Sequence, residues 1–186
     1  QERVQGVFVR GSADGYYLQD DNSMRLDQEK AFTYLKDCLS KGQTRIDLAE
    51  GDCYGNVPDS DADLEQRRIW EQICEFTDKC CRLAYDMGTE TVAISERDAA
   101  DFLEKQPGSG IPFLDEEGKL AVSETAVREW VEHLASEYDT WETEREFEAT
   151  RGETVTVKDV TYGTQLDMEA ETAYLLGALG GTPDAA

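Results

Sequence analysis

Cysteine and histidine often carry nucleophilic or metal chemistry, and this 186-residue sequence contains few of them. The five cysteines have no regular spacing and include no CxxC motif, so they predict no disulfide framework. His133 is the only histidine, which gives little support to a Cys/His zinc cluster and leaves one imidazole as base for a nucleophile. We therefore expect no metal site and no cofactor. The cysteines are Cys38, Cys53, Cys74, Cys80 and Cys81.

The loop sequence GDCYGN contains the two candidates for a reaction centre, Cys53 and Tyr54. Acidic side chains surround them and disfavour a thiolate, so we expect Cys53 to be an ordinary loop thiol. A catalytic role for Cys53 or Tyr54 is the alternative. Nearby, Asp59, Asp61 and Asp63 resemble part of a calcium-binding loop, but the glycine and glutamate that such a loop needs are missing.

The charge balance limits the partners of this chain. Asp and Glu number 41 against 18 Lys and Arg, a formal charge of -23. Nucleic acid and anionic membrane surfaces are disfavoured because their phosphates would be repelled. No apolar run approaches the roughly 20 residues of a membrane-spanning helix. The sequence begins at Gln1 without a signal-like segment, so we expect a processed chain whose targeting segment has been removed.

Turn residues and hydrophobic spacing predict alternating strands and helices. The strongest signal is a long helix over 61–88, with apolar residues at spacings of three and four. An alternative places a strand and a helix within 70–88. The acidic run 139–148 is expected to be a solvated connector. The other expected elements are a hairpin in 4–19, helices in 25–42, 97–105, 125–138 and 166–181, and strands in 44–49, 91–94 and 153–163, with a strand–turn–strand ahead of the 125–138 helix.

From 44 to 138 the order is strand, helix, strand, helix, strand, strand, helix, which is the thioredoxin-like order. The segment FLEKQPGSGIPFLDEEGKLAVSETAVREWVEHLASEY also resembles the N-terminal domain of the glutathione transferase family. In that family an Asn-Pro-x-Gly segment leads to Val-Pro, a strand, a glycine turn, a second strand, and Glu-Ser-x-Ala-Ile at a helix start. The matching residues here are Pro107 and Gly108, Ile111 and Pro112, Gly118, and Glu124 and Thr125.

The resemblance implies an α/β, thioredoxin-like domain over 44–138. Residues 1–43 would form an N-terminal hairpin-and-helix extension, and residues 139–186 a C-terminal tail. Strands near Val92 and Phe113 would share one sheet, and the Ile111–Pro112 peptide bond would be cis.

The resemblance further implies a glutathione-like ligand site at Ile111, Pro112, Glu124 and Thr125. The alternative for that corner is a helix cap made by Ser123 or Thr125. On the following helix, His133 is expected to be structural and Trp130 to be a core or interface residue.

The glutathione transferase family has an all-helical second domain, but fewer than fifty residues follow Tyr138 here and part of them reads as strand, so we do not expect that domain. We therefore expect a non-catalytic accessory or scaffold subunit of a larger assembly, such as an organellar respiratory or photosynthetic complex. Other subunits would contact the terminal segments, including the helix around 173–179, and the chain could lie peripheral to a membrane complex in a chloroplast or mitochondrion. The alternative is a glutathione-dependent transferase or thiol-handling enzyme, with glutathione as its cofactor.

Overall fold

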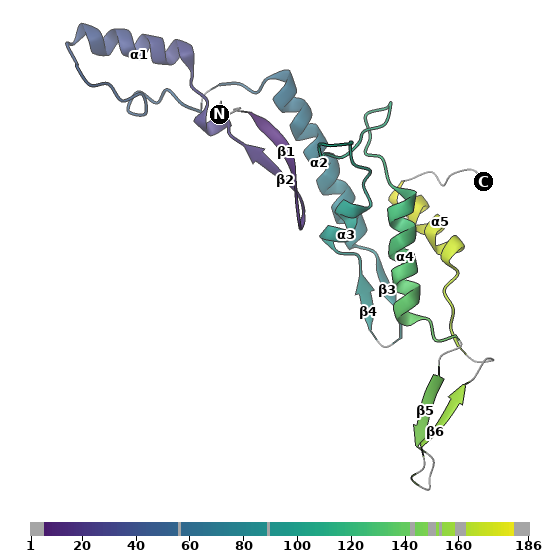
Figure 1. The fold of residues 1–186 in the computed structure, drawn as a ribbon. Helices are drawn as coiled ribbons and strands as arrows, with labels where there is room; N and C mark the ends of the chain where they lie inside the picture. The colour runs from purple at the N-terminus through teal and green to yellow at the C-terminus, as the bar shows by residue number, and fades with distance from the viewer. Residues whose placement is uncertain are drawn as a thin grey trace. The chain divides into compact units, whose positions relative to one another are not determined.

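Three antiparallel hairpins, five α-helices and one short 3-10 helix make up the regular structure that the computed structural model describes (Figure 1). The described residues are 6–55, 57–88, 90–141, 144–148, 152, 154–158 and 163–180. The chain divides into two compact units. The first comprises Gln1–Glu75 with Lys105–Ile111, and the second Phe76–Glu104 with Pro112–Ala186.

The first unit opens with the hairpin of β1 (Val7–Ser12) and β2 (Gly15–Asp20). Ser12 pairs with Gly15 across a turn, and Gly15 has a φ of 131°, which glycine adopts more readily than other residues. Val7 and Val9 alternate onto one face and are fully buried. The hairpin expected from the sequence is confirmed.

Two helices complete the first unit, α1 (Gln28–Ser40) and the larger part of α2 (Asp61–Cys81), preceded by a short 3-10 helix (Asn22–Met24). Asp27 caps α1 by accepting a hydrogen bond from the Lys30 N–H. The α1 prediction is confirmed, and one continuous α2 rules out the strand-and-helix alternative over 70–88. The strand expected over 44–49 is wrong, because that segment forms turns and irregular backbone.

Helix α2 ends at Cys81, seven residues earlier than the expected end at 88, and the second unit begins within this helix, at Phe76. The chain then forms β3 (Ala84–Asp86), which pairs with β4 (Thr91–Ala93). Helix α3 (Glu96–Asp101) and helix α4 (Glu124–Tyr138) follow. The core of this unit is built from fully buried side chains of the segments around α3 and of α4, among them Ile94, Phe102, Leu103, Val127 and Val131.

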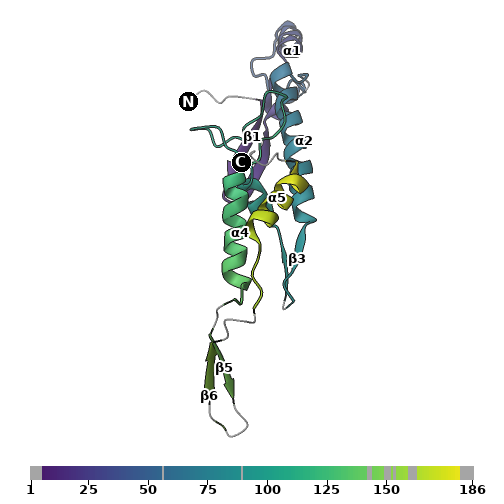
Figure 2. The same cartoon turned by 90° about the vertical axis from the view of Figure 1, so that its right-hand side faces the viewer.

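Helix α5 (Met168–Leu179) lies beside α4 in both views (Figures 1 and 2). Leu175, Leu176 and Leu179 are buried there within the second unit, so these leucines do not form the partner contact expected for 173–179. The acidic run 139–148 is also not a simple connector, because β5 (Glu144–Glu148) pairs with β6 (Thr154–Lys158). Among the described residues, no helix is long and apolar enough to cross a membrane.

The expected thioredoxin-like fold is wrong. Every sheet among the described residues has two strands, and the neighbour of β4 is β3, so Val92 and Phe113 share no sheet. Phe113 lies in an irregular segment, and the Ile111–Pro112 peptide bond is trans. The physical reason lies in the strands: a central parallel sheet needs strands that are buried on both faces, whereas β3 and β4 expose residues at both ends of short strands.

Candidate functional site

The four residues of the expected glutathione-like site have different surroundings. Ile111 belongs to the first unit, whereas Pro112 is fully buried in the second. Glu124 is the first residue of α4, and its carboxylate accepts a hydrogen bond from the Arg128 guanidinium at 3.0 Å. Thr125 is exposed.

The Ser-Glu-Thr corner caps α4. The Ser123 hydroxyl oxygen accepts a hydrogen bond from the Ala126 N–H at 3.3 Å, which satisfies one of the free donors at the helix start. Ser123 therefore performs the capping role that the sequence left open as the alternative.

Cys53 and Tyr54 lie in the first unit, at the strand-like bridge between Tyr54 and Leu26. The Cys53 side chain is completely buried, and its thiol donates to the Gly51 carbonyl at 3.5 Å. Tyr54 is 41% exposed. Burial of the Cys53 sulfur keeps it away from solvent, where a substrate would have to reach it.

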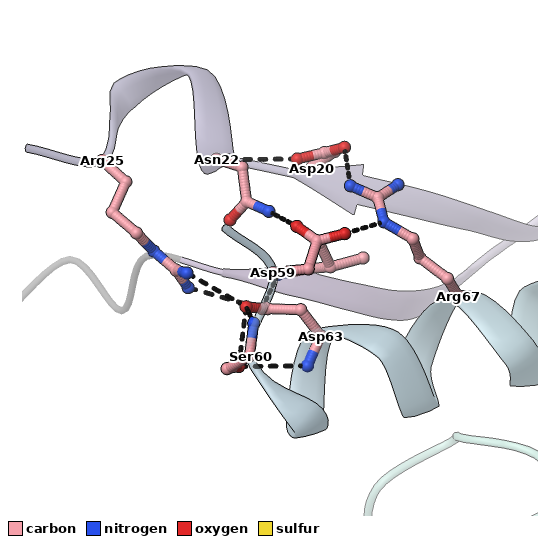
Figure 3. Close-up of polar contacts among 8 residues, drawn as sticks. Asp20, Asn22, Arg25, Asp59, Ser60, Asp63 and Arg67 are labelled. Atoms are coloured by element: carbon pink, nitrogen blue, oxygen red, sulfur yellow. Dashed lines mark hydrogen bonds and ion pairs between the residues drawn. The ribbon is translucent and has the colours of Figure 1, made fainter. Parts of the chain in front are cut away.

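A polar network at the start of α2 joins several segments of the first unit (Figure 3). Asp63 is 4% exposed and accepts hydrogen bonds from the Ser60 hydroxyl at 2.7 Å, the Ser60 N–H at 2.8 Å and the Val7 N–H at 2.9 Å. Arg25 adds an ion pair at 3.0 Å. The Ser60 hydroxyl and amide, followed by the Val7 amide and Arg25, hold the pKa of Asp63 well below its usual range.

The second half of this network is centred on Arg67 (Figure 3). Its guanidinium donates to Asp59 and to Asp20, each at 2.7 Å, and the side-chain amide of Asn22 also donates to Asp59. The hydrogen bond from Arg67 lowers the pKa of Asp20. Arginines therefore pair with two of the three aspartates that resembled a calcium loop, Asp59 and Asp63. No cluster that could hold a metal ion occurs in the described part of the chain.

The second unit contains a cavity of about 200 Å³ between β4, α3 and α4. Two aromatic rings and two carboxylates lie in its wall, and neither an arginine nor a lysine lines it. The lining residues are Val92 from β4, Asp98 from α3, and Trp130, His133, Leu134, Glu137 and Tyr138 from α4.

Packing and hydrogen bonds hold the aromatic wall in place. The ring centroids of Trp130 and Tyr85 are 5.5 Å apart, and the Phe102 ring lies perpendicular to the Trp130 ring with centroids 6.0 Å apart. The Tyr138 hydroxyl donates to the Glu90 carboxylate at 2.9 Å, which raises the pKa of Tyr138. Contacts within the chain therefore hold both aromatic side chains of the cavity in place.

Two further contacts fix the elements around the cavity. Asp98 accepts hydrogen bonds from the Ser95 N–H at 2.9 Å and the Ser95 hydroxyl at 2.6 Å, in the capping box of α3. The Tyr85 hydroxyl donates to Glu171 of α5 at 2.6 Å. Burial, followed by this hydrogen bond, raises the pKa of Tyr85 above its usual range.

The cavity is suited to binding. It is smaller than the roughly 300–1,000 Å³ of sites for drug-sized ligands, and therefore fits one sugar ring or one long side chain. Sequence reasoning placed Trp130 in a core or interface and His133 in a structural role, and it did not assign Glu137 or Tyr138. The available signal was helical spacing, which puts Trp130, His133, Glu137 and Tyr138 near one another along α4.

Comparisons with known proteins point to a family. The sequence profile described as "Putative peptidoglycan binding domain" matches residues 92–185, just over half of the chain. All residues that line the cavity fall within that span, whereas Cys53 and Tyr54 lie outside it. A search of curated proteins finds no match.

Two solved structures are similar to this chain. One is described as the Ldtfm–avibactam carbamoyl enzyme, with 22% identity, a TM-score of 0.42, and coverage of 61% of this chain and 42% of that one. The other is an Enterococcus faecium L,D-transpeptidase mutant, with 23% identity, a TM-score of 0.41, and coverage of 60% and 42%. The chain thus spans about two fifths of the length of these proteins.

The family match corrects several expectations. The resemblance to thioredoxin-like proteins and glutathione transferases is wrong, and so is the accessory subunit of that type. The chloroplast or mitochondrial location is wrong as well, since the family points to the bacterial cell wall. The misleading signals were Pro112, Gly118 and the capping corner at Ser123. They specify a local strand–turn–strand–helix sequence, which many folds contain.

Proposed function

The chain belongs to the peptidoglycan-binding domain family, and from that premise we propose that it binds peptidoglycan through the cavity beside Trp130. Peptidoglycan is a polymer of N-acetylated sugars that carry short peptides. Aromatic faces can pack against the apolar faces of such groups, and carboxylates can accept their hydroxyl, amide or ammonium hydrogens.

The observation that carries this proposal is the position of the cavity. It lies wholly within the residues that match the family, and Tyr85 and Phe102 hold its Trp130 wall in a defined orientation. A preformed wall reduces the entropy lost when a ligand is ordered. Its remaining polar groups come from Asp98, Glu137 and His133, so the site combines packing surface with hydrogen-bonding capacity.

Co-sedimentation with purified, protein-free, insoluble peptidoglycan tests the proposal. We expect the full chain to sediment with the polymer, and Trp130→Phe to weaken binding by about 3- to 10-fold, because stacking on an aromatic wall contributes on the order of 1 kcal/mol. Trp141→Phe is the matched control, since Trp141 is 42% exposed and does not line the cavity. Failure of the wild-type chain to sediment would refute peptidoglycan binding, and equal binding by both variants would refute this cavity as the site.

A protein partner on the N-terminal segment is the second candidate. Phe32 and Leu39 of α1 are 62% and 64% exposed, and their spacing of seven puts them on one helix face. The same assay separates the candidates. Binding to crude cell walls that still carry proteins, combined with no binding to the purified polymer, would favour a cell-wall protein as the partner.

A further inference from the structure

We infer that the cavity beside Trp130 takes the primary ammonium group of a peptidoglycan stem peptide, and not a sugar of the glycan strand. This inference rests on the proposed function and names the part of the polymer that enters the site. The stem peptides of peptidoglycan can carry a diamino acid, whose side chain ends in a free amine.

The first argument is the charge of the cavity wall. Asp98 and Glu137 both line the cavity, and neither forms an ion pair with any residue that the structure describes. In the first unit, by contrast, Asp59 and Asp63 are paired with arginines. The cavity carboxylates therefore keep capacity for an external cation.

The second argument is the pairing of these carboxylates with aromatic rings. Trp130 and Tyr138 line the same cavity, and the ring faces of both residue types attract a cation within about 6 Å. Glu90 accepts the Tyr138 hydroxyl hydrogen at 2.9 Å, which places a further carboxylate beside that ring. Aromatic rings with nearby carboxylates are the surroundings that an alkylammonium group prefers.

The third argument excludes the other groups of the polymer. A stem-peptide carboxylate would be repelled by Asp98 and Glu137, and by the overall charge of -23. A neutral sugar would cover these carboxylates without offering them an opposite charge, and partly desolvated charges without a partner are costly. Of these groups, only an ammonium group brings a positive charge to both the rings and the carboxylates.

Calorimetric titration of the full chain with three soluble fragments tests the inference. The first is a disaccharide–peptide with the free side-chain amine, the second is the same fragment with that amine acetylated, and the third is a peptide-free glycan oligomer. We expect the first to bind, the acetylated fragment to bind at least about 10-fold more weakly, and the glycan to show no measurable binding. Raising the salt concentration should weaken the first interaction, because exposed charges are screened.

Two variants connect the result to the cavity. Glu137→Gln should weaken binding of the free-amine fragment by about 3- to 10-fold and leave the acetylated fragment unaffected. Glu132→Gln is the matched control, since Glu132 is exposed on the same helix and does not line the cavity. Asp98→Asn is a second test that does not depend on Glu137.

The outcomes separate this inference from the proposed function. Equal binding of the free and acetylated fragments, or binding of the glycan oligomer alone, would overturn the ammonium site and leave peptidoglycan binding standing. Binding to the insoluble polymer with no binding to the free-amine fragment would also overturn it. Failure to bind either the fragments or the polymer would instead refute the proposed function.

Discussion

Asp63 offers a sharp test of how the first unit is held together. The change Asp63→Ala removes the acceptor of the Val7 amide, the Ser60 amide and the Ser60 hydroxyl, and it deprives Arg25 of its ion-pair partner. The buried carboxylate is thus a junction between β1, the segment before α1 and the start of α2.

The expected loss follows from these contacts. Removing one partner of a buried ion pair typically costs about 3–5 kcal/mol, because the other charge is left uncompensated. The Arg25 side chain is 20% exposed and can reach water, so we expect a loss near the lower end, about 3 kcal/mol in the free energy of unfolding. A domain has only about 5–15 kcal/mol in total, so this change is large.

The assay is native-state hydrogen exchange at the Val7 and Ser60 amides, with urea unfolding as the second measurement. A loss of about 3 kcal/mol accelerates exchange by roughly two orders of magnitude. Asp63→Asn keeps one acceptor oxygen and should lose less. Asp61→Asn is the matched control, because Asp61 is exposed in the same first turn and should lose only about 0.5 kcal/mol of dipole interaction.

The pH dependence has a defined sign. The pKa of Asp63 in the folded chain lies below its ordinary value of 3.8, so its ionised form is stabilised by folding. That contribution is fully present above about pH 4 and is lost as the pH falls toward the folded-state pKa. Asp63→Ala should lack this part of the acid sensitivity. If Asp63→Ala loses no more stability than Asp61→Asn, the argument that this network stabilises the first unit is wrong.

Two further changes probe the second unit. Leu176→Ala should lower the free energy of unfolding by about 2–5 kcal/mol, because Leu176 is only 2% exposed. Tyr174→Ala, on the same helix, should change it by less than about 0.5 kcal/mol, because Tyr174 is 61% exposed. Urea unfolding measures both, and equal effects would show that α5 does not bury its leucines. Tyr85→Phe should lower the free energy of unfolding by about 1–2 kcal/mol, because the hydrogen bond to Glu171 is lost while the ring contact with Trp130 remains. Thermal unfolding measures this change, and an unchanged stability would contradict the prediction.

The sequence by itself determined the elements whose signals are local. The β1–β2 hairpin follows from its turn before Gly15 and from alternating residues, and α1, α4 and α5 follow from apolar spacing and their caps. These signals involve residues within a few positions of one another, so no knowledge of distant contacts was needed. Local signals were also the source of the error in fold class, because a strand–turn–strand–helix pattern around Pro112 does not specify which strands pair.

Only the tertiary structure decided where α2 ends and what surrounds the cavity. Leu83 and Met87 continue the helical spacing of α2, yet the chain between them forms β3, in which Tyr85 pairs with Val92 of β4. Likewise, Val92 and Trp130 meet at one cavity although they are far apart in the sequence. Helical periodicity indicates that one face of a helix is apolar, but it does not indicate which other segment packs against that face.

The choice of charge partners was likewise beyond the sequence. The many carboxylates of this chain are chemically equivalent in the sequence, but Asp63 is buried against Arg25 and the Val7 amide, whereas Glu137 stays at the cavity without an ion pair among the described residues. The strength of a charge–charge interaction depends on the distance between the charges and on how deeply they are buried. Distance and burial both depend on how distant segments of the chain pack. Folding therefore decides which acidic groups are buried against partners and which line the cavity.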